Sequence, residues 1–264
     1  MKLSATRLKT YLTCPRQFRY AYVDEIPSVL TGPLAFGQVI HQTLDRMHLL
    51  SLETGLPLDT EYGLSEFNRL WREALERDCP LFKDGETMIR EYQELADTML
   101  KGYVERHKDN TAPLVVEFPF QLPWGEHMLE GIIDRIDEGD NGLIIVDYKT
   151  GKRKPTQREL ASDLQLTVYA FAVEQVFGQP VERIVYYHLR DQTPLLTTRS
   201  QSDFGWLCDE VLPFIIQAIE AGSFAPRPGY WCRYCDYREL CLAEGPDELP
   251  LADRPQVQST VEVA

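Results

Sequence analysis

The sequence predicts an α/β fold in which a small sheet is flanked by helices. In the first part of the chain, to about residue 112, apolar residues recur at helical spacing. From about residue 114 the period changes, and short apolar runs typical of strands alternate with further helical stretches. A helical first half followed by a small sheet with flanking helices is typical of the α/β class.

The predicted elements follow one another without internal repeats. The helices are expected at residues 4–24, 33–52, 64–107, 157–177 and 203–222, and the strands at residues 114–122, 127–138, 142–150 and 181–189. Ser4 suits an N-cap, and Pro15 predicts a break in the first helix near Cys14. Interruptions are expected at Cys79-Pro80 and Asp84-Gly85. Residues 246–264, rich in Pro and acids, are expected to form a flexible tail.

The composition indicates a globular protein with an acidic body. Hydrophobic residues make up 44% of the chain, enough for a core, and no apolar stretch is long enough to predict a membrane span. The start of the chain has no apolar signal region, so a cytoplasmic protein is expected. A net charge of −14 argues against nonspecific coating of nucleic acid. Two basic stretches, residues 1–19 and 149–158, nevertheless contain no acid and suit local contact with a polyanion.

Acidic residues interrupt or end two of the predicted strands. Asp134 lies within the apolar strand Gly131–Arg135, and the next strand ends in Asp147-Tyr148-Lys149. The turn signal Asp140-Asn141-Gly142 between them predicts antiparallel pairing, which brings the two aspartates together. Asp147 and Lys149 share a face because they are two positions apart. Converging carboxylates suit Mg²⁺ or Mn²⁺, and a neighbouring lysine suits stabilisation of charge on a phosphate.

Together with three further motifs, this arrangement resembles the PD-(D/E)XK nuclease superfamily, and within it the RecB-like group that includes the AddB nuclease domain. The motifs, in order, are Ser4-Ala5-Thr6-Arg7-Leu8 with Tyr11, Cys14-Pro15 and Phe18; Phe36-Gly37 with His41; Gly131–Arg135; Val146–Gly151; and Gln165 with Tyr169. The likeness covers residues 3–41, 113–190 and 226–241. Ile133 stands where a proline is usual.

The resemblance implies one nuclease domain over residues 1–245, with a restriction-endonuclease-like core and a helical insertion at residues 51–112. It implies that His41, Asp134, Asp147 and the backbone carbonyl of Tyr148 bind the metal ion. Lys149 would activate or position the water, and Gln165 and Tyr169, one helical turn apart, would hold the lysine or the scissile strand. The predicted DNA contacts are Lys152, Arg153, Lys154 and Arg16.

Cysteines near the end of the chain predict a second metal centre. Cys232, Cys235 and Cys241 form a C-x₂-C-x₅-C pattern, which in a reducing compartment indicates metal rather than a disulfide. Their spacing leaves structural zinc and an iron–sulfur cluster open. The resemblance implies that Cys14 is the fourth ligand of a 4Fe–4S cluster, so that the cluster joins residues 226–241 to the N-terminal helix. Cys79 and Cys208 are expected to be ordinary thiols.

The expected function is metal-dependent cleavage of DNA, most simply by an exonuclease that acts on single strands or ends in repair or recombination, with a helicase as a possible partner. The alternative is a CRISPR adaptation nuclease that works with adaptation proteins, although 93 positions separate His41 from Asp134, more than that group is expected to have. A DNA- or partner-binding module that keeps an iron–sulfur or zinc centre without cutting is the alternative of another class.

Overall fold

The computed structural model of the protein describes residues 1–78, 80–82, 85–107 and 112–245. Its chain forms two compact units. The first contains Met1–Ala5 and Val29–Glu210, and the second contains Thr6–Ser28 with the described residues from Val211 onward. Cys79, the predicted interruption at Asp84 and the predicted tail 246–264 lie outside the described residues. The expectation of a single domain over residues 1–245 stays a prediction.

A six-stranded mixed sheet forms the centre of the first unit. Its strands are β1 (Lys2–Leu3), β2 (Val115–Trp124), β3 (His127–Glu138), β4 (Leu143–Lys149), β5 (Val181–His188) and β6 (Thr193–Thr197). The order is β1-β3-β4-β5-β6, and β2 pairs with β3. β3 and β4 are antiparallel, as the turn signal predicted, whereas β4 and β5 are parallel. The predicted mixed α/β fold is therefore confirmed.

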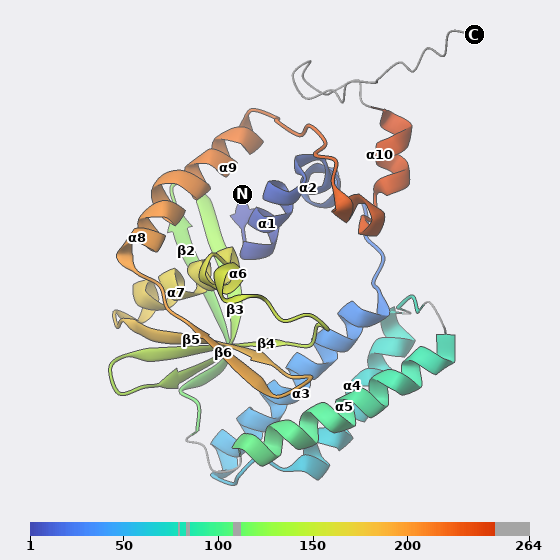
Figure 1. Cartoon of the computed structure of the whole chain (residues 1–264), viewed down its shortest axis with the longest axis vertical. Coiled ribbons are helices and arrows are strands. Elements are labelled where there is room, and N and C mark those ends of the chain that lie inside the picture. Colours follow the sequence, from blue (N-terminus) through green and yellow to red (C-terminus); the bar gives the residue numbers. More distant parts are fainter. Residues whose placement is uncertain (79, 83–84, 108–111, 246–264) are drawn as a thin grey trace, which may run out of the picture. The chain divides into compact units, whose positions relative to one another are not determined.

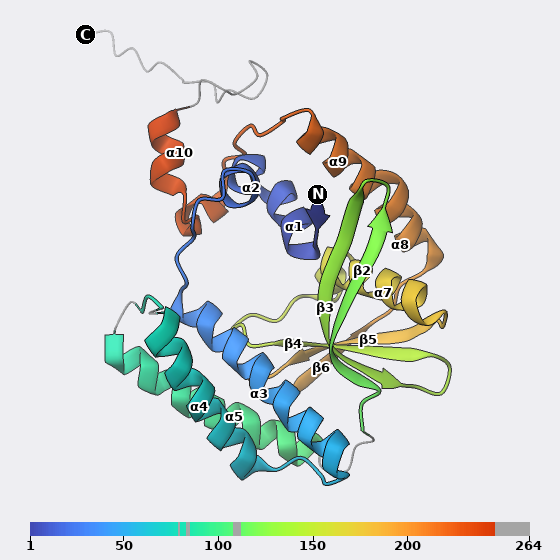
Figure 2. The same ribbon diagram turned by 180° about the vertical axis from the view of Figure 1, so that it is seen from behind.

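Helices lie on both faces of this sheet (Figure 1). Helix α3 (Gly32–Thr54), α4 (Thr60–Asp78) and α5 (Gly85–His107) form one layer, seen from the other side in Figure 2. Alternate residues of β4, namely Ile144, Val146 and Tyr148, belong to the core shared with these helices. The intervening residues of β4 face the opposite side, where α6 (Gln157–Ala161) and α7 (Leu164–Phe177) form the connection between the parallel strands β4 and β5.

Aromatic side chains fill the helical layer. Trp71 of α4 is 1% exposed and meets Phe36 of α3 edge-on, with the ring centroids 6.1 Å apart. Tyr92 of α5 packs on the same Phe36 ring at 4.6 Å. The predicted insertion thus shares a continuous core with α3.

Among the described residues, no helix combines the length and the apolar character needed to cross a membrane.

Local capping explains where the structure departs from the predicted elements. Residues 157–177 form two helices, because the Asp163 side chain accepts a hydrogen bond from the Leu166 N–H and starts α7 anew. The predicted helix 203–222 is α8 (Gln201–Gly205), a π-helical turn (Trp206–Val211) and α9 (Leu212–Glu220). Pro213 lacks an N–H, which favours such a widened turn before it. Strand β6 contains Pro194, lies at the sheet edge and was not predicted.

The second unit joins the two ends of the described chain. Its elements are α1 (Ala5–Thr13), which starts in the first unit, α2 (Pro15–Tyr22), α9, a 3₁₀ turn (Tyr230–Tyr234) and α10 (Arg238–Glu244). The predicted break at Cys14 is present, with Pro15 as the first residue of α2. Tyr11 Oη donates to the carbonyl of Ser223 at 2.7 Å, and the rings of Tyr20 and Tyr237 lie 5.5 Å apart. The two ends of the described chain therefore contact one another directly.

Candidate active site

Strands β3 and β4 separate at the two predicted catalytic aspartates. Their ladder ends at the pair Arg135–Val146, and Asp134 and Asp147 are the next residues. Beyond this fork β3 continues beside β2 and pairs with β1. Asp134 bridges the fork, because its Oδ2 accepts a 2.8 Å hydrogen bond from the backbone N–H of Tyr148. The antiparallel pairing predicted from the turn thus places both acids at one point of the sheet.

Helix α3 brings His41 to this fork. Its Nδ1 lies 2.9 Å from Asp134 Oδ1. One helical turn earlier, a Cβ built on Gly37 would lie 3.1 Å from Thr150 Oγ1, a close approach to the residue that follows β4. A larger residue at position 37 would therefore press against the end of β4. The glycine and the histidine of this motif lie on the same face of the helix because they are four positions apart.

Lys149 connects Asp147 to helix α7. Its Nζ donates to Asp147 Oδ1 at 2.9 Å and to Gln165 Oε1 at 3.4 Å. Gln165 Nε2 in turn donates to Tyr169 Oη at 2.8 Å. The two α7 side chains reach the site together because they are one turn apart. The structure therefore brings all four side chains into one continuous set of hydrogen bonds.

Burial and mutual charge control the pKa values at the fork. Burial raises the pKa of Asp147 in spite of Lys149, and the charge of Asp134 adds to the rise. Burial also acts to raise the pKa of Asp134, but His41 and Lys149 outweigh it and hold that pKa below its ordinary value. For Lys149 burial acts in the opposite direction, yet the two carboxylates raise its pKa above the ordinary value. Each charge at the fork thus depends on its neighbours.

The side chains at the fork fit a divalent cation by their chemistry. Two carboxylates, an imidazole and a backbone carbonyl are ligands that Mg²⁺ and Mn²⁺ accept. Asp147 is 1% exposed, and its Oδ2 accepts no hydrogen bond, although the Lys149 ammonium lies 2.8 Å away. As the side chains stand, the described part of the chain contains no group of three or more His, Cys, Asp or Glu residues positioned to hold a metal ion. Lys149 engages the Asp147 carboxylate, and His41 and the Tyr148 N–H engage the Asp134 carboxylate.

Two further acids lie close to the fork, beyond the site residues predicted from the sequence; of the two, the sequence suggests only Glu117, as an extra acid on the preceding strand. Asp45 follows His41 by one turn of α3, and burial together with the nearby charge of Glu117 raises its pKa to about 6. Glu117 is exposed and has a φ of 46°, which a non-glycine residue rarely adopts. Its two neighbours in β2 pair with the residues on either side of Asp134. Additional negative charge is therefore placed beside the fork.

A buried polar network supports the fork from the helical layer. Tyr103 Oη of α5 lies 2.6 Å from Tyr148 Oη and 2.7 Å from His48 Nε2 of α3, and it accepts a 3.1 Å hydrogen bond from Arg135 Nη1. Burial, followed by the charge of Arg135, lowers the pKa of His48 to about 3, so its imidazole is neutral at pH 7. Arg135 and Tyr148 are the chain neighbours of the two aspartates. Helix α5 therefore holds both strands at the fork.

We expect Tyr103→Phe to lower the free energy of unfolding by about 1–3 kcal/mol, because it leaves buried polar partners unsatisfied. Urea denaturation followed by circular dichroism measures the change. Tyr62→Phe is the matched control, since the Tyr62 hydroxyl makes no hydrogen bond within the described residues and the ring lies in the same helical layer. Equal stability of the two variants would contradict the central position of Tyr103 in the network.

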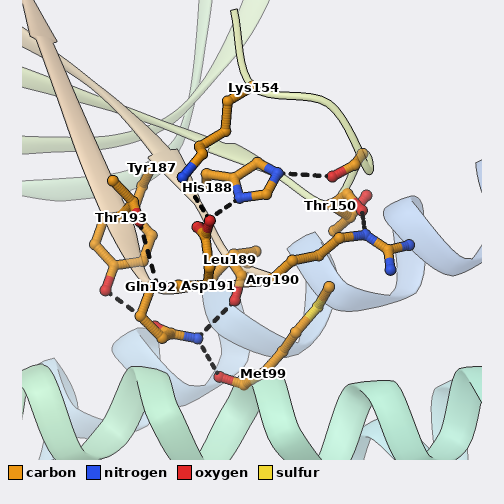
Figure 3. A network of polar contacts seen from close by, with 11 residues as sticks. Met99, Thr150, Lys154, Tyr187, His188, Leu189, Arg190, Asp191, Gln192 and Thr193 are labelled. Atoms are coloured by element: carbon orange, nitrogen blue, oxygen red, sulfur yellow. Dashed lines mark hydrogen bonds and ion pairs between the residues drawn. The ribbon is translucent and has the colours of Figure 1, made fainter.

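The loop after Lys149 is tied to the β5–β6 turn (Figure 3). His188 Nε2 donates to the carbonyl of Gly151 at 2.8 Å, and its Nδ1 lies 2.7 Å from Asp191 Oδ1. Arg190 Nε donates to the carbonyl of Thr150 at 2.7 Å. Gln192 carries the connection on to α5 by donating to the carbonyl of Met99 at 2.9 Å. The segment that follows the candidate catalytic lysine is thus held from several sides.

The four predicted DNA contacts, three in this loop and Arg16 outside it, differ in whether the side chain is exposed and unpaired. Arg153 pairs with Glu159 at 2.5 Å, and Lys154 pairs with Asp191 at 2.6 Å. Lys152 is exposed and makes no ion pair within the described residues. Arg16, in the second unit, is 1% exposed, and its guanidinium donates to the carbonyl of Gly245 at 3.1 Å. Of these four basic residues, Lys152 alone is both exposed and uncommitted among the described residues.

The four predicted cluster cysteines all lie in the second unit. Burial raises the pKa of Cys235, and the charges of Cys14, Cys232 and Cys241 raise it further, so these thiols lie close to one another. The backbone N–H of Arg227 lies 3.4 Å from Cys14 Sγ, and that of Gly229 lies 3.4 Å from Cys232 Sγ. Four thiols with peptide N–H donors to sulfur suit a thiolate-ligated cluster. None of the cysteines in the described part of the chain forms a disulfide, and Cys208, which is partly exposed, lies outside the cysteine pattern.

The chain is similar in sequence to a known protein family and to several curated proteins. The chain matches the PD-(D/E)XK nuclease superfamily over residues 2–242. It is 38% identical over 72 residues to one chain of the ATP-dependent helicase/nuclease of Oceanobacillus iheyensis, a match that covers 25% of this chain and 6% of that protein. It is 26% identical over 133 residues to the CRISPR-associated exonuclease Cas4 of Francisella tularensis subsp. novicida, covering 47% of this chain and 61% of that protein.

Longer matches are weaker in identity. The Gene 69 protein of Mycobacterium phage D29 is 22% identical over 264 residues, which cover 90% of this chain and 95% of that protein. A crystal structure from Eubacterium rectale, provisionally named an exonuclease, aligns with a TM-score of 0.54 at 10% identity, over 89% of this chain and 87% of that one. This likeness shows a shared fold. The chain spans only part of the helicase/nuclease protein and of the CRISPR-associated exonuclease.

Proposed function

We propose that this chain, which belongs to the PD-(D/E)XK nuclease superfamily, hydrolyses DNA phosphodiester bonds with the help of Mg²⁺ or Mn²⁺. The observation that carries the proposal is the meeting of His41, Asp134, Asp147 and Lys149 at the fork between β3 and β4. These side chains come from α3, β3 and β4, and without a shared role their convergence would bury charge at a cost. Cleavage of single strands or DNA ends, in repair or recombination in the cytoplasm, is the proposed activity.

The proposed mechanism assigns each side chain a task in hydrolysis. His41, Asp134, Asp147 and the carbonyl of Tyr148 would hold the cation, which when bound supplies positive charge against the charge that develops on the phosphate. Lys149, held by Asp147 and Gln165, orients the attacking water and stabilises the same developing charge. The water oxygen forms the new bond to phosphorus and gives its proton to solvent, while the bond from phosphorus to the leaving sugar oxygen breaks and that oxygen takes a proton from solvent.

We also propose that Cys14, Cys232, Cys235 and Cys241 hold a 4Fe–4S cluster. Support comes from their common place in the second unit and from the N–H groups that approach two of the sulfur atoms. A cluster ligated by thiolates from both ends would tie α2 to the 3₁₀ turn and α10. Zinc bound by the same four thiolates is the alternative that metal analysis distinguishes.

A CRISPR adaptation nuclease is the second candidate, favoured by the likeness to the Francisella exonuclease over 47% of this chain. A helicase partner is the corresponding expectation from the likeness to the helicase/nuclease protein. Co-purification of the chain from its own cells, followed by identification of bound proteins, separates the two. Recovery of a helicase favours repair or recombination, and recovery of adaptation proteins favours spacer acquisition.

The proposed activity is tested by incubating the purified protein with end-labelled single- and double-stranded DNA. We expect cleavage with Mg²⁺ or Mn²⁺, no cleavage in EDTA, and recovery when the metal ion is restored, because the reaction depends on a bound cation. Shortening from an end, rather than internal cutting, would identify an exonuclease. Cleavage that persists unchanged in EDTA would refute the assignment of a metal-dependent reaction.

A further inference from the structure

A pocket of about 390 Å³ lies between one face of α5 and the loop that follows the candidate catalytic lysine. Lys152 and Arg190 form its basic side, and residues of α5 form the other side. The volume lies within the range of small-molecule sites, about 300–1,000 Å³. All of these residues belong to the first unit. The pocket is therefore formed by the predicted insertion together with the loop that follows Lys149.

The basic side of the pocket has two cations without counter-ions. Within the described residues neither Lys152 nor Arg190 pairs with a carboxylate. Arg190 is partly buried, and its Nε donates to the carbonyl of Thr150. Its other two nitrogens make no hydrogen bond within the described residues. A partly buried guanidinium with free N–H groups suits a phosphate, which it can bind with two parallel hydrogen bonds.

The opposite side of the pocket is apolar with acidic neighbours. Met88, Tyr92 and Leu95 recur at helical spacing on α5 and are each partly buried. The Tyr92 ring is held from behind by Phe36, so its position is fixed by the core. Such a surface suits a nucleic-acid base, since aromatic and apolar side chains accept the flat faces of bases.

Glu91 and Glu94 lie on the α5 side and oppose phosphate there. Their carboxylates can accept hydrogen bonds from the exocyclic amino groups of bases. A phosphate is therefore favoured only near Lys152 and Arg190, and a base is favoured near Tyr92. The two ends of the pocket match the two ends of one nucleotide.

We propose that this pocket binds one unpaired nucleotide of the DNA strand beside the scissile phosphate. Arg190 contacts the residue after Lys149, and Lys152 lies three positions beyond that lysine. A phosphate bound by Lys152 and Arg190 would therefore be held by the protein loop that follows the candidate catalytic lysine. A base that is paired and stacked in a duplex cannot enter the pocket. The inference rests on the proposed nuclease function and extends it, because it assigns the single strand as the preferred substrate and gives the insertion a role in binding.

The test measures binding of a short fluorescent single strand in EDTA, where cleavage is not required. We expect Lys152→Ala to weaken binding about five- to tenfold and to reduce the salt slope by about 0.7, the value for one phosphate contact on a single strand. Arg190→Gln should weaken binding at least as much. Arg158→Ala is the matched control, because Arg158 is exposed in the same basic stretch but does not line the pocket. Duplex binding should change little in all three variants.

A second measurement locates the base. Moving a single abasic site along the strand should reveal one position at which the wild-type affinity falls about fivefold or more, since one stacked base is lost. In Met88→Ala the same position should matter less. If Lys152→Ala and Arg158→Ala weaken single-strand binding equally, or if no abasic position lowers the affinity, the proposed nucleotide binding in this pocket is wrong. If the wild type shows these binding effects but never cleaves DNA, the nuclease proposal is wrong and the nucleotide-binding proposal is supported. If it cleaves DNA without these binding effects, the nuclease proposal is supported and the nucleotide-binding proposal is wrong.

Discussion

Asp147→Asn is expected to abolish metal-dependent DNA cleavage while leaving most DNA binding in place. The substitution keeps the size of the side chain but removes a carboxylate from the proposed metal site, and it leaves Lys149 without its ion-pair partner. Lys149→Ala should lower the cleavage rate by about 10²–10³-fold or more, because a single donor to developing charge is worth that much in other enzymes. Rates are measured on end-labelled DNA, and circular dichroism checks the fold.

A surface ion pair of the same chemistry provides the control. Asp97 and Lys101 lie 2.8 Å apart on α5 and are about half exposed, with exposed side-chain fractions of 42% and 58%. Asp97→Asn and Lys101→Ala remove the same groups away from the fork and should leave cleavage unchanged, since exposed pairs contribute little. If Asp147→Asn cleaves at the wild-type rate in a folded protein, the assignment of the fork as the active site is wrong.

Cys232→Ser is expected to bleach a protein that, freshly purified, is brown and absorbs broadly near roughly 400 nm. Iron analysis should find about four iron atoms per wild-type chain and far fewer in the variant. Both stretches of the second unit should become more sensitive to protease, because the cluster would join them by covalent bonds to the metal, whereas the contacts shown between them, such as the Tyr20–Tyr237 ring pair and the Tyr11–Ser223 hydrogen bond, are non-covalent. Cleavage activity should fall only indirectly, since none of these cysteines belongs to the fork.

Two further variants separate a cluster from a general effect of removing a thiol. Cys14→Ser should bleach the protein as Cys232→Ser does, although the two residues lie at opposite ends of the chain. Cys208→Ser should keep the colour, since Cys208 lies in the π-helical turn outside the cysteine pattern. If the wild-type protein, prepared without oxygen, is colourless and contains stoichiometric zinc, the four cysteines bind zinc and not an iron–sulfur cluster. The nuclease proposal would not be affected.

Much of the fold and the meeting of the two aspartates were predictable from the sequence, because these depend on residues close together in the chain, whereas His41, 93 positions from Asp134, was predicted only by the family resemblance. The change in periodicity near residue 114 predicted where helices give way to strands. The turn at residues 140–142 predicted the antiparallel pair β3–β4, and that pairing aligned Asp134 with Asp147. Strands β1 and β6 were missed: one has two residues and the other contains a proline, so neither shows a clear alternation.

The tertiary structure alone decided which charged and polar groups are available. In the sequence Lys152, Arg153 and Lys154 look equivalent, but Arg153 and Lys154 are engaged by Glu159 and by Asp191, which lies 37 positions from Lys154. Tyr103 gave no signal in the sequence, yet its hydroxyl joins α3, β3 and β4 behind the fork. Such pairings depend on which side chains folding brings into contact, and helical or strand periodicity carries no record of them.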